Sequence, residues 1–273
     1  MLLRIVFIIA LACAIFGGAY IAVQTLYLQP DLDLKADVDE PRPEPPKDPS
    51  LPDFQQCIEI EKSGSQSDAV AAFEKFLQVH PSSSKRGEAR DRIGELNSSI
   101  FFNVKPTEEN TVVAMPGDAL ARISNRVKMS MELIVHLNKL PNDKIQRGQR
   151  LIAFPTNFRL VLKQTQQRVI LMNGDKFFRQ YPTLSWPGKK PLPKMTVKVT
   201  EKAAINEKGQ APKPASQEYY GCFHTIGYPI PGHSIFSHSD DPSRPIPSGI
   251  RLAPEHMSEI AVLLPKGAQV TLE

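Results

Sequence analysis

Cys222 and His224 are the pair of residues whose types could carry out nucleophilic chemistry. The sequence predicts a strand over residues 219–226, on which positions two apart share a face, so the thiol and the imidazole would point the same way. A thiolate formed beside an imidazole can attack a carbonyl carbon and form an acyl-enzyme. Such neighbours are usually too far apart for a direct hydrogen bond, and a buried core thiol explains Cys222 more simply.

A metal site is a second reading of the same region. His224, His233, His238, Asp240 and Asp241 all occur within 18 residues. They lack the spacing of a known ligand set, and turns rich in Asp, Ser and Pro account for them. The chain has only three cysteines, too few for a four-ligand zinc site. We therefore expect no metal and no cofactor.

The clearest pattern lies in residues 112–154. Residues 112–114 predict a short strand, and Asp118 and Ser130 stand where each could cap one of two amphipathic helices. Residues 150–154 predict a closing strand. The order is therefore strand, helix, helix, strand.

This segment resembles a LysM domain. The matching positions are Gly117, Asp118, Leu120, Ile123, Met129, Ser130, Leu133, Asn138, Leu140, Ile145, Gly148, Gln149 and Leu151. The resemblance implies a module over residues 108–156 that binds N-acetylglucosamine-containing glycan, such as peptidoglycan, between the loops at residues 117–120 and 138–142. The glycan-binding residues that it implies are Gly117, Asp118, Ala119, Leu120, Asn138, Lys139 and Leu140.

The remainder, residues 157–273, has the pattern of a mostly β domain with one late helix. Asn173-Gly174 is a strong hairpin turn, and residues 254–264 predict the helix. The strands are expected at residues 158–162, 168–172, 177–184, 196–200, 219–226, 234–238, 248–252 and 268–272.

The order and spacing of these elements resemble the L,D-transpeptidase (YkuD) domain. The matching positions are Ile250, Arg251, Leu252, Glu255, Leu263, Pro265, Gly267 and Val270. The resemblance implies a cysteine nucleophile immediately before Ile250 and a histidine base from an upstream strand. Together these would form an acyl-enzyme on a peptidoglycan stem peptide.

The chain departs from that family at the reacting positions. Gly249 replaces the nucleophile, Ser248 replaces a glycine, and Ser237 takes the place of the base. His238 is displaced by one residue, which on a strand directs its side chain to the opposite face. We therefore expect no catalytic residue among the degenerate pocket positions Ser237, His238, Ser248, Gly249 and Arg251. The alternative is an active L,D-transpeptidase with a non-standard nucleophile such as Cys222.

The N-terminal residues predict a membrane anchor followed by a spacer. Residues 5–23 are uncharged and mostly apolar, long enough for a helix to cross a bilayer, and Arg4 precedes them. A cleaved signal is the alternative to this anchor over residues 1–28. Residues 29–52 combine seven prolines with acidic residues, which predicts an extended linker.

Residues 53–100 predict a helical hairpin. The pattern of Ala69, Phe73, Phe76 and Pro81 resembles one tetratricopeptide repeat, although a generic helical hairpin fits nearly as well. One repeat cannot form the concave groove of an array. Recruitment of an envelope protein by this hairpin is therefore the weakest partner prediction.

Composition and net charge limit the remaining classes of function and fold. Lys and Arg number 33 against 29 Asp and Glu, and a net charge of +4 does not favour a nucleic-acid partner. The sequence thus predicts a multidomain α+β protein: transmembrane helix, helical hairpin, small βααβ LysM module and mostly β YkuD-like domain. Its expected location is the bacterial cytoplasmic membrane, crossed once, with the later domains extracytoplasmic in the periplasm.

Overall fold

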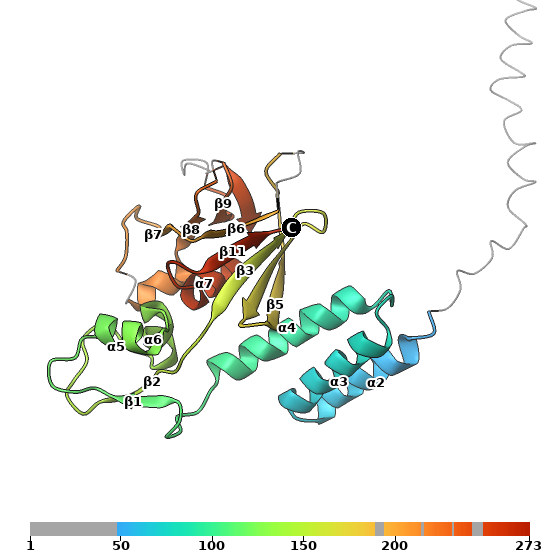
Figure 1. Cartoon of the computed structure of the whole chain (residues 1–273), viewed down its shortest axis with the longest axis horizontal. Helices are drawn as coiled ribbons and strands as arrows, with labels where there is room; N and C mark the ends of the chain where they lie inside the picture. Colours follow the sequence, from blue (N-terminus) through green and yellow to red (C-terminus); the bar gives the residue numbers. More distant parts are fainter. Residues whose placement is uncertain (1–47, 189–193, 214–215, 231, 242–247) are drawn as a thin grey trace, which may run out of the picture. The chain divides into compact units, whose positions relative to one another are not determined.

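The computed structural model describes residues 48–188, 194–213, 216–230, 232–241 and 248–273 (Figure 1). Residues 50–273 form one compact unit. Its mixed α+β architecture, with a β-rich C-terminal region, confirms that part of the predicted fold class. The predicted anchor over residues 1–28 and most of the linker over residues 29–52 lie outside the described residues. Within the described part of the chain, no helix combines the length and apolarity needed to cross a membrane.

Three helices open the compact unit: α2 (Leu51–Ser63), α3 (Gln66–Val79) and α4 (Arg86–Phe102). Ser65 begins α3, because its hydroxyl accepts the backbone N–H of Asp68. The apolar faces of the helices meet around the ring of Phe54, which lies 5.9 Å from that of Phe73 and 5.4 Å from that of Phe76. This small core is separate from the main one.

The third helix, α4, packs on strand β5 (Lys176–Pro182) (Figure 1). The Asn97 side chain donates to the carbonyl of Phe178 at 2.9 Å. A Cβ atom at Gly94 would lie 2.7 Å from the side chain of Arg179, so only glycine allows this approach. The packed face of α4 is therefore occupied by the chain's own sheet.

The predicted βααβ order is present in residues 111–152. Strands β1 (Thr111–Val113) and β2 (Arg150–Ile152) pair antiparallel, and helices α5 (Leu120–Val127) and α6 (Met131–Leu137) lie between them in sequence. Ser130 caps α6 as predicted, its hydroxyl accepting the N–H of Leu133 at 3.2 Å. Asp118 does not cap α5; Ala119 occupies that position and makes no side-chain hydrogen bond.

The C-terminal region contains two sheets. The five-stranded sheet has the order β5-β4-β3-β11-β6, and the four-stranded sheet has the order β10-β9-β8-β7. The strands not yet given are β3 (Phe158–Lys163), β4 (Arg168–Asn173), β6 (Met195–Lys198), β7 (Glu201–Ile205), β8 (Phe223–Gly227), β9 (Ser234–Ser237), β10 (Gly249–Leu252) and β11 (Gln269–Leu272). The pairs β3–β11 and β9–β10 are parallel, and the other pairs are antiparallel.

The predicted strand over residues 219–226 is wrong in its first half. Residues Gln217–Gly221 form a short 3₁₀ helix, and β8 begins at Phe223. Strand β7, which pairs with β8, was not predicted at all, because residues 201–205 show little apolar alternation. Cys222 therefore lies at the junction of a turn and a strand rather than inside a strand.

Helix α7 (Pro254–Leu263) is buried on every side from Met257 to Leu263. Such a helix needs partners for its polar residues. The carboxylate of Glu259 accepts from Arg179 at 2.7 Å and from the Ser98 hydroxyl at 2.5 Å, so one buried group joins α7, β5 and α4. Burial raises the pKa of Glu259 despite the Arg179 charge.

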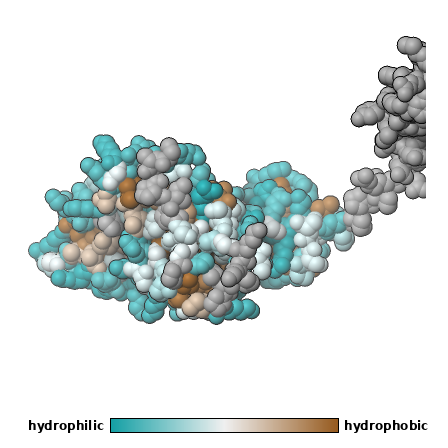
Figure 2. All heavy atoms as spheres, turned by 90° about the horizontal axis from the view of Figure 1, so that it is seen from above, coloured by the Kyte–Doolittle hydropathy of each residue, from teal (hydrophilic) through white to brown (hydrophobic). Residues whose placement is uncertain are grey.

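One apolar core runs without a break from the βααβ segment into the β-rich region. It includes Leu120, Ile123 and Leu133 from α5 and α6, and Leu160 and Val270 from the five-stranded sheet. The Ser130 hydroxyl also donates to the carbonyl of Val262 in α7 at 2.5 Å. The face in Figure 2 is mostly hydrophilic, with small, scattered hydrophobic areas.

Candidate functional site

The predicted glycan-binding loops contain residues that serve the fold. Leu120 and Leu140 are buried in the core, with 1% and 6% of their surface exposed. The carboxylate of Asp118 accepts the backbone N–H of Met115 at 2.9 Å and lies 3.5 Å from Arg126, with only 6% of the side chain exposed. The Asp118 side chain thus stabilises the loop between β1 and α5 by binding the backbone of Met115 in the same loop.

Asn138 joins the end of α6 to β2. Its Nδ2 donates to the carbonyls of Ile134 and Ile152 at 2.8 and 2.9 Å, and its Oδ1 accepts the N–H of Ile152 at 2.7 Å. These hydrogen bonds use both N–H groups and the oxygen of the amide, so the Asn138 side chain stabilises the loop.

Gly117, Ala119 and Lys139 are the exposed members of the predicted set. Gly117 and Lys139 have left-handed φ angles of 82° and 50°, which turn the two loops sharply. A Cβ atom at Gly117 would meet nothing within 4 Å, so this loop faces open space. Contact with a glycan at these loops would therefore involve backbone groups and these three residues.

Gly249, at the predicted nucleophile position, is held against the neighbouring strand. It pairs in parallel with Ser234, has φ 155°, and leaves no room for a side chain. An added Cβ atom would lie 1.8 Å from the Ser234 carbonyl oxygen and 2.7 Å from its carbon. A cysteine cannot occupy this backbone position unless β9 and β10 move apart.

Ser237 and His238, at and beside the predicted base position, face different surroundings. Ser237 is buried, and its hydroxyl accepts the backbone N–H of His224 at 2.9 Å. His238 is partly exposed, and its Nε2 lies 2.9 Å from the carboxylate of Asp240, whose side chain is fully exposed. The side chains of Ser237 and His238 therefore lie in different surroundings, one buried and the other partly exposed and paired with Asp240.

Ser248 and Arg251 make contacts that belong to the strand framework. The Ser248 hydroxyl donates to the carbonyl of Gly232 at 3.1 Å, and the Ser248 carbonyl accepts the hydroxyl of Ser234. The backbone N–H of Arg251 donates to the carbonyl of Ser185 at 3.1 Å. Among the described residues, no histidine forms a hydrogen bond with the Ser248 hydroxyl.

Cys222 and His224, the alternative pair, are both buried. The Cys222 thiol donates to the carbonyl of Glu218 at 3.0 Å. The ring of His224 has no exposed surface and packs edge-on against Tyr219 at 4.8 Å, and burial lowers its pKa to about 4. In the described part of the chain, no three His, Cys, Asp or Glu residues gather as metal ligands.

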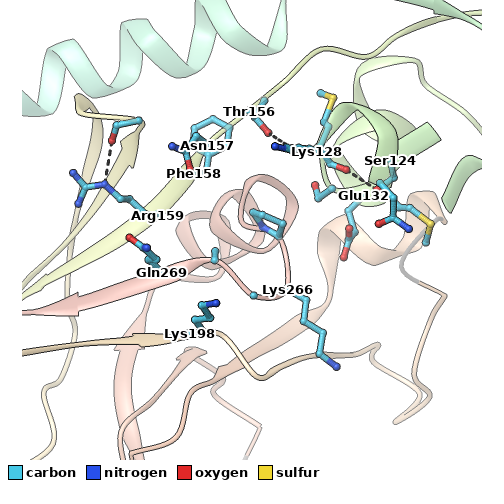
Figure 3. Close-up of a pocket in the computed structure, with 18 of the residues that line it drawn as sticks. Ser124, Lys128, Glu132, Thr156, Asn157, Phe158, Arg159, Lys198, Lys266 and Gln269 are labelled. Carbon is cyan, nitrogen blue, oxygen red and sulfur yellow. Dashed lines mark hydrogen bonds between the residues drawn. The ribbon is translucent and has the colours of Figure 1, made fainter. Parts of the chain in front are cut away.

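A cavity of about 810 Å³ was not predicted from the sequence (Figure 3). Lys128, Arg159, Lys198 and Lys266 line it, each from a different part of the chain. Glu132 also borders it, and its carboxylate is bound by Lys202 at 2.8 Å. Residues so far apart in the sequence form no motif. The only signal in the sequence is the small excess of basic over acidic residues, which does not identify the four.

Comparison with known proteins identifies one part of the chain by its sequence. The LysM domain model matches residues 115–153. No curated protein matches the chain.

Among solved structures, similarity is distant. An L,D-transpeptidase from Mycobacterium smegmatis is 12% identical, with a TM-score of 0.31, covering 46% of this chain and 63% of that one. An L,D-transpeptidase of Enterococcus faecium is 15% identical, with a TM-score of 0.31, covering 48% of this chain and 58% of that one. The chain thus spans less than two thirds of either transpeptidase.

A longer alignment joins the chain to a fused Zn-dependent amidase/peptidase/peptidoglycan-binding domain-containing protein from Clostridium acetobutylicum. It is 16% identical, with a TM-score of 0.31, and covers 77% of this chain and 85% of that one. The chain therefore contains a LysM domain at residues 115–153, and its solved structural neighbours include L,D-transpeptidases.

Proposed function

We propose that the protein binds peptidoglycan through its LysM domain and holds a transpeptidase-like domain that has lost its catalytic residues. The match of residues 115–153 to LysM carries the first half of this proposal. The exposed loop residues Gly117, Ala119 and Lys139 form the contact surface for N-acetylglucosamine units.

Point variants test glycan binding better than removal of the module, because the LysM core continues into the β-rich region. The double variant Ala119→Glu/Lys139→Glu places two carboxylates at the two loops. We expect it to stop the full-length protein from sedimenting with insoluble peptidoglycan. The matched control Ala211→Glu/Lys208→Glu makes the same changes at exposed residues of another loop and should sediment normally. Equal sedimentation of both variants would refute the glycan site.

The position of Gly249 supports the proposed loss of transpeptidase activity. A nucleophilic step needs a side chain with an activating base, and the closeness of the Ser234 carbonyl leaves no space for a side chain there. Ser248 is the nearest hydroxyl in sequence, and its proton is directed to the Gly232 carbonyl. A serine without a base is a poor nucleophile near neutral pH.

An active enzyme would need a non-standard nucleophile such as Cys222. Its thiol is buried, with 5% of the residue exposed, and buried thiols are unreactive. We therefore expect no covalent adduct when the full-length protein is incubated with a carbapenem and its intact mass is measured. We also expect no exchange of a D-amino acid onto a tetrapeptide stem. A stoichiometric adduct that disappears in Cys222→Ala would establish the alternative function.

Export of the compact unit completes the proposal. The uncharged run at residues 5–23, with Arg4 before it, supports a single-pass anchor in the cytoplasmic membrane and a periplasmic location for the rest. A reporter fused after Glu273 should then be active outside the cytoplasm. A reporter active only in the cytoplasm would contradict both the location and access to the wall.

A further inference from the structure

The cavity of about 810 Å³ lies between the LysM helices and the β-rich region (Figure 3). Its walls come from the end of α5 and start of α6, from the start of β3 and the β4–β5 turn, from the end of β6, and from the segment between α7 and β11. It contains no residue of the two predicted glycan loops and none of the degenerate transpeptidase positions. It is therefore separate from both sites discussed above.

Four cationic side chains line this cavity: Lys128, Arg159, Lys198 and Lys266. Lys128 follows α5 in a left-handed conformation, with φ 56°, and belongs to the LysM domain. The other three belong to the β-rich region, so the full set exists only while the two parts are packed together. In the described residues, the ammonium groups of Lys128, Lys198 and Lys266 form no ion pair.

The acidic residues of the lining offset only part of this charge. Glu132 is bound by Lys202, which lies outside the lining, and Asp175 is fully exposed at 3.6 Å from Arg159. Three amides complete the wall: the exposed side chains of Asn125, Asn157 and Gln269. The cavity thus presents ammonium groups for anions together with amides that can pair with peptide groups.

We propose that this cavity binds a short acidic peptide, its carboxylates on the lysines and its backbone on the amides. A volume of about 810 Å³ lies within the size range of small-ligand sites. The inference rests on the proposed function: the peptide is the carboxylate-bearing stem of the polymer whose glycan the LysM loops hold. The three amides favour a peptide over a repeating phosphate chain, because they can pair with both the N–H and the carbonyl groups of a peptide backbone, whereas phosphate oxygens only accept.

The test compares two soluble ligands on the full-length protein in detergent: a peptidoglycan fragment that carries its peptide stem, and the same glycan after an amidase has removed the peptide. We expect the stem to strengthen binding about tenfold, the effect of one or two charge-assisted contacts at an exposed site. The variant Lys198→Ala/Lys266→Ala should lose that gain and keep the affinity for bare glycan. The control Lys75→Ala/Lys208→Ala removes the same charge from exposed lysines elsewhere and should behave as wild type.

Each result separates this inference from the proposed function. If wild type binds neither ligand, the glycan-binding function itself is wrong. If wild type binds both equally, or Lys198→Ala/Lys266→Ala keeps the full gain, the peptide site is wrong while the glycan site stands. If a glycerol-phosphate polymer displaces the stem-bearing fragment better than a free acidic tetrapeptide does, the cavity is a phosphate-polymer site and the proposal is overturned.

Discussion

Lys202 in β7 and Glu132 in α6 form an ion pair of 2.8 Å with only 7% and 12% of their side chains exposed. The pair joins the four-stranded sheet to the LysM domain. Burial lowers the pKa of Lys202, and the charge of Glu132 opposes that shift. Each of the two buried charges is therefore stabilised by the other.

Removing one partner of this pair should destabilise the protein strongly. We expect Lys202→Met to cost about 3–5 kcal/mol in the free energy of unfolding, because it leaves the Glu132 carboxylate buried without a counter-charge. The double variant Glu132→Leu/Lys202→Met should recover most of the loss. Urea unfolding measures both. The exposed pair Lys62–Glu59 is the control, and Lys62→Met should cost less than about 1 kcal/mol.

The close approach of Gly249 to Ser234 predicts a steric penalty. Gly249→Ala should destabilise the protein by about 3 kcal/mol or more, because the new methyl group overlaps the Ser234 carbonyl. Gly209→Ala is the control: its φ of 73° is also left-handed, but a Cβ atom there meets nothing within 4 Å. It should cost only about 1 kcal/mol. Equal losses in the two variants, by urea unfolding, would show that β9 and β10 separate easily.

Burial of His224 predicts a pH-dependent stability. Its pKa is about 4 in the folded protein, below the value of about 6.5 for an unfolded chain. Below pH ~6.5 the unfolded chain therefore takes up a proton that the folded chain does not. Stability from this residue is complete above that pH and falls as the pH drops towards 4, by roughly 3 kcal/mol at most.

The variant His224→Phe isolates this effect, because phenylalanine fills the buried site without titrating. Unfolding free energies of wild type and variant, measured in urea at several pH values between 4 and 7.5, should diverge by the pH dependence described above. Parallel profiles would mean that His224 is already solvated or protonated in the folded state.

The Asn138 amide predicts a loss of stability rather than a direct loss of glycan contact. Asn138→Ala leaves the N–H and carbonyl of Ile152 without their partner, which should cost about 1–3 kcal/mol. The exposed Asn125 is the control, and Asn125→Ala should change stability by less than about 0.5 kcal/mol. If Asn138→Ala abolishes glycan binding with its melting temperature unchanged, the side chain contacts sugar after all.

Local features of the sequence were sufficient to predict local structure. The capping role of Ser130 and a hairpin turn after Met172 were both predicted, because each depends on residues close in sequence, although the turn consists of Gly174 and Asp175 rather than Asn173 and Gly174. The roles of Asp118 and Cys222 were predicted less well. Asp118 accepts a hydrogen bond from Met115 rather than from the following helix. Cys222 follows a 3₁₀ helix, which was not predicted because the residues that form it have the composition of a strand.

Contacts between distant segments could not be predicted. The approach of Gly249 to Ser234 requires knowledge of which strands pair in parallel, and a single sequence does not give it. The same holds for the buried carboxylate of Glu259, since Arg179 and Ser98 are each about 80 or more residues away. The cavity lysines are scattered in the same manner, so their convergence becomes visible only in the folded chain.

The hydrogen bond from Ser130 to Val262 and the continuous core have a mechanical consequence. In the proposed function, tension applied to a glycan at the LysM loops would enter α6 and pass directly into α7 and the sheets. A LysM domain on a flexible linker would instead swing and absorb the pull. Here a load on the LysM loops would be shared by many packed side chains at once, so the LysM domain and the sheets would move as one body.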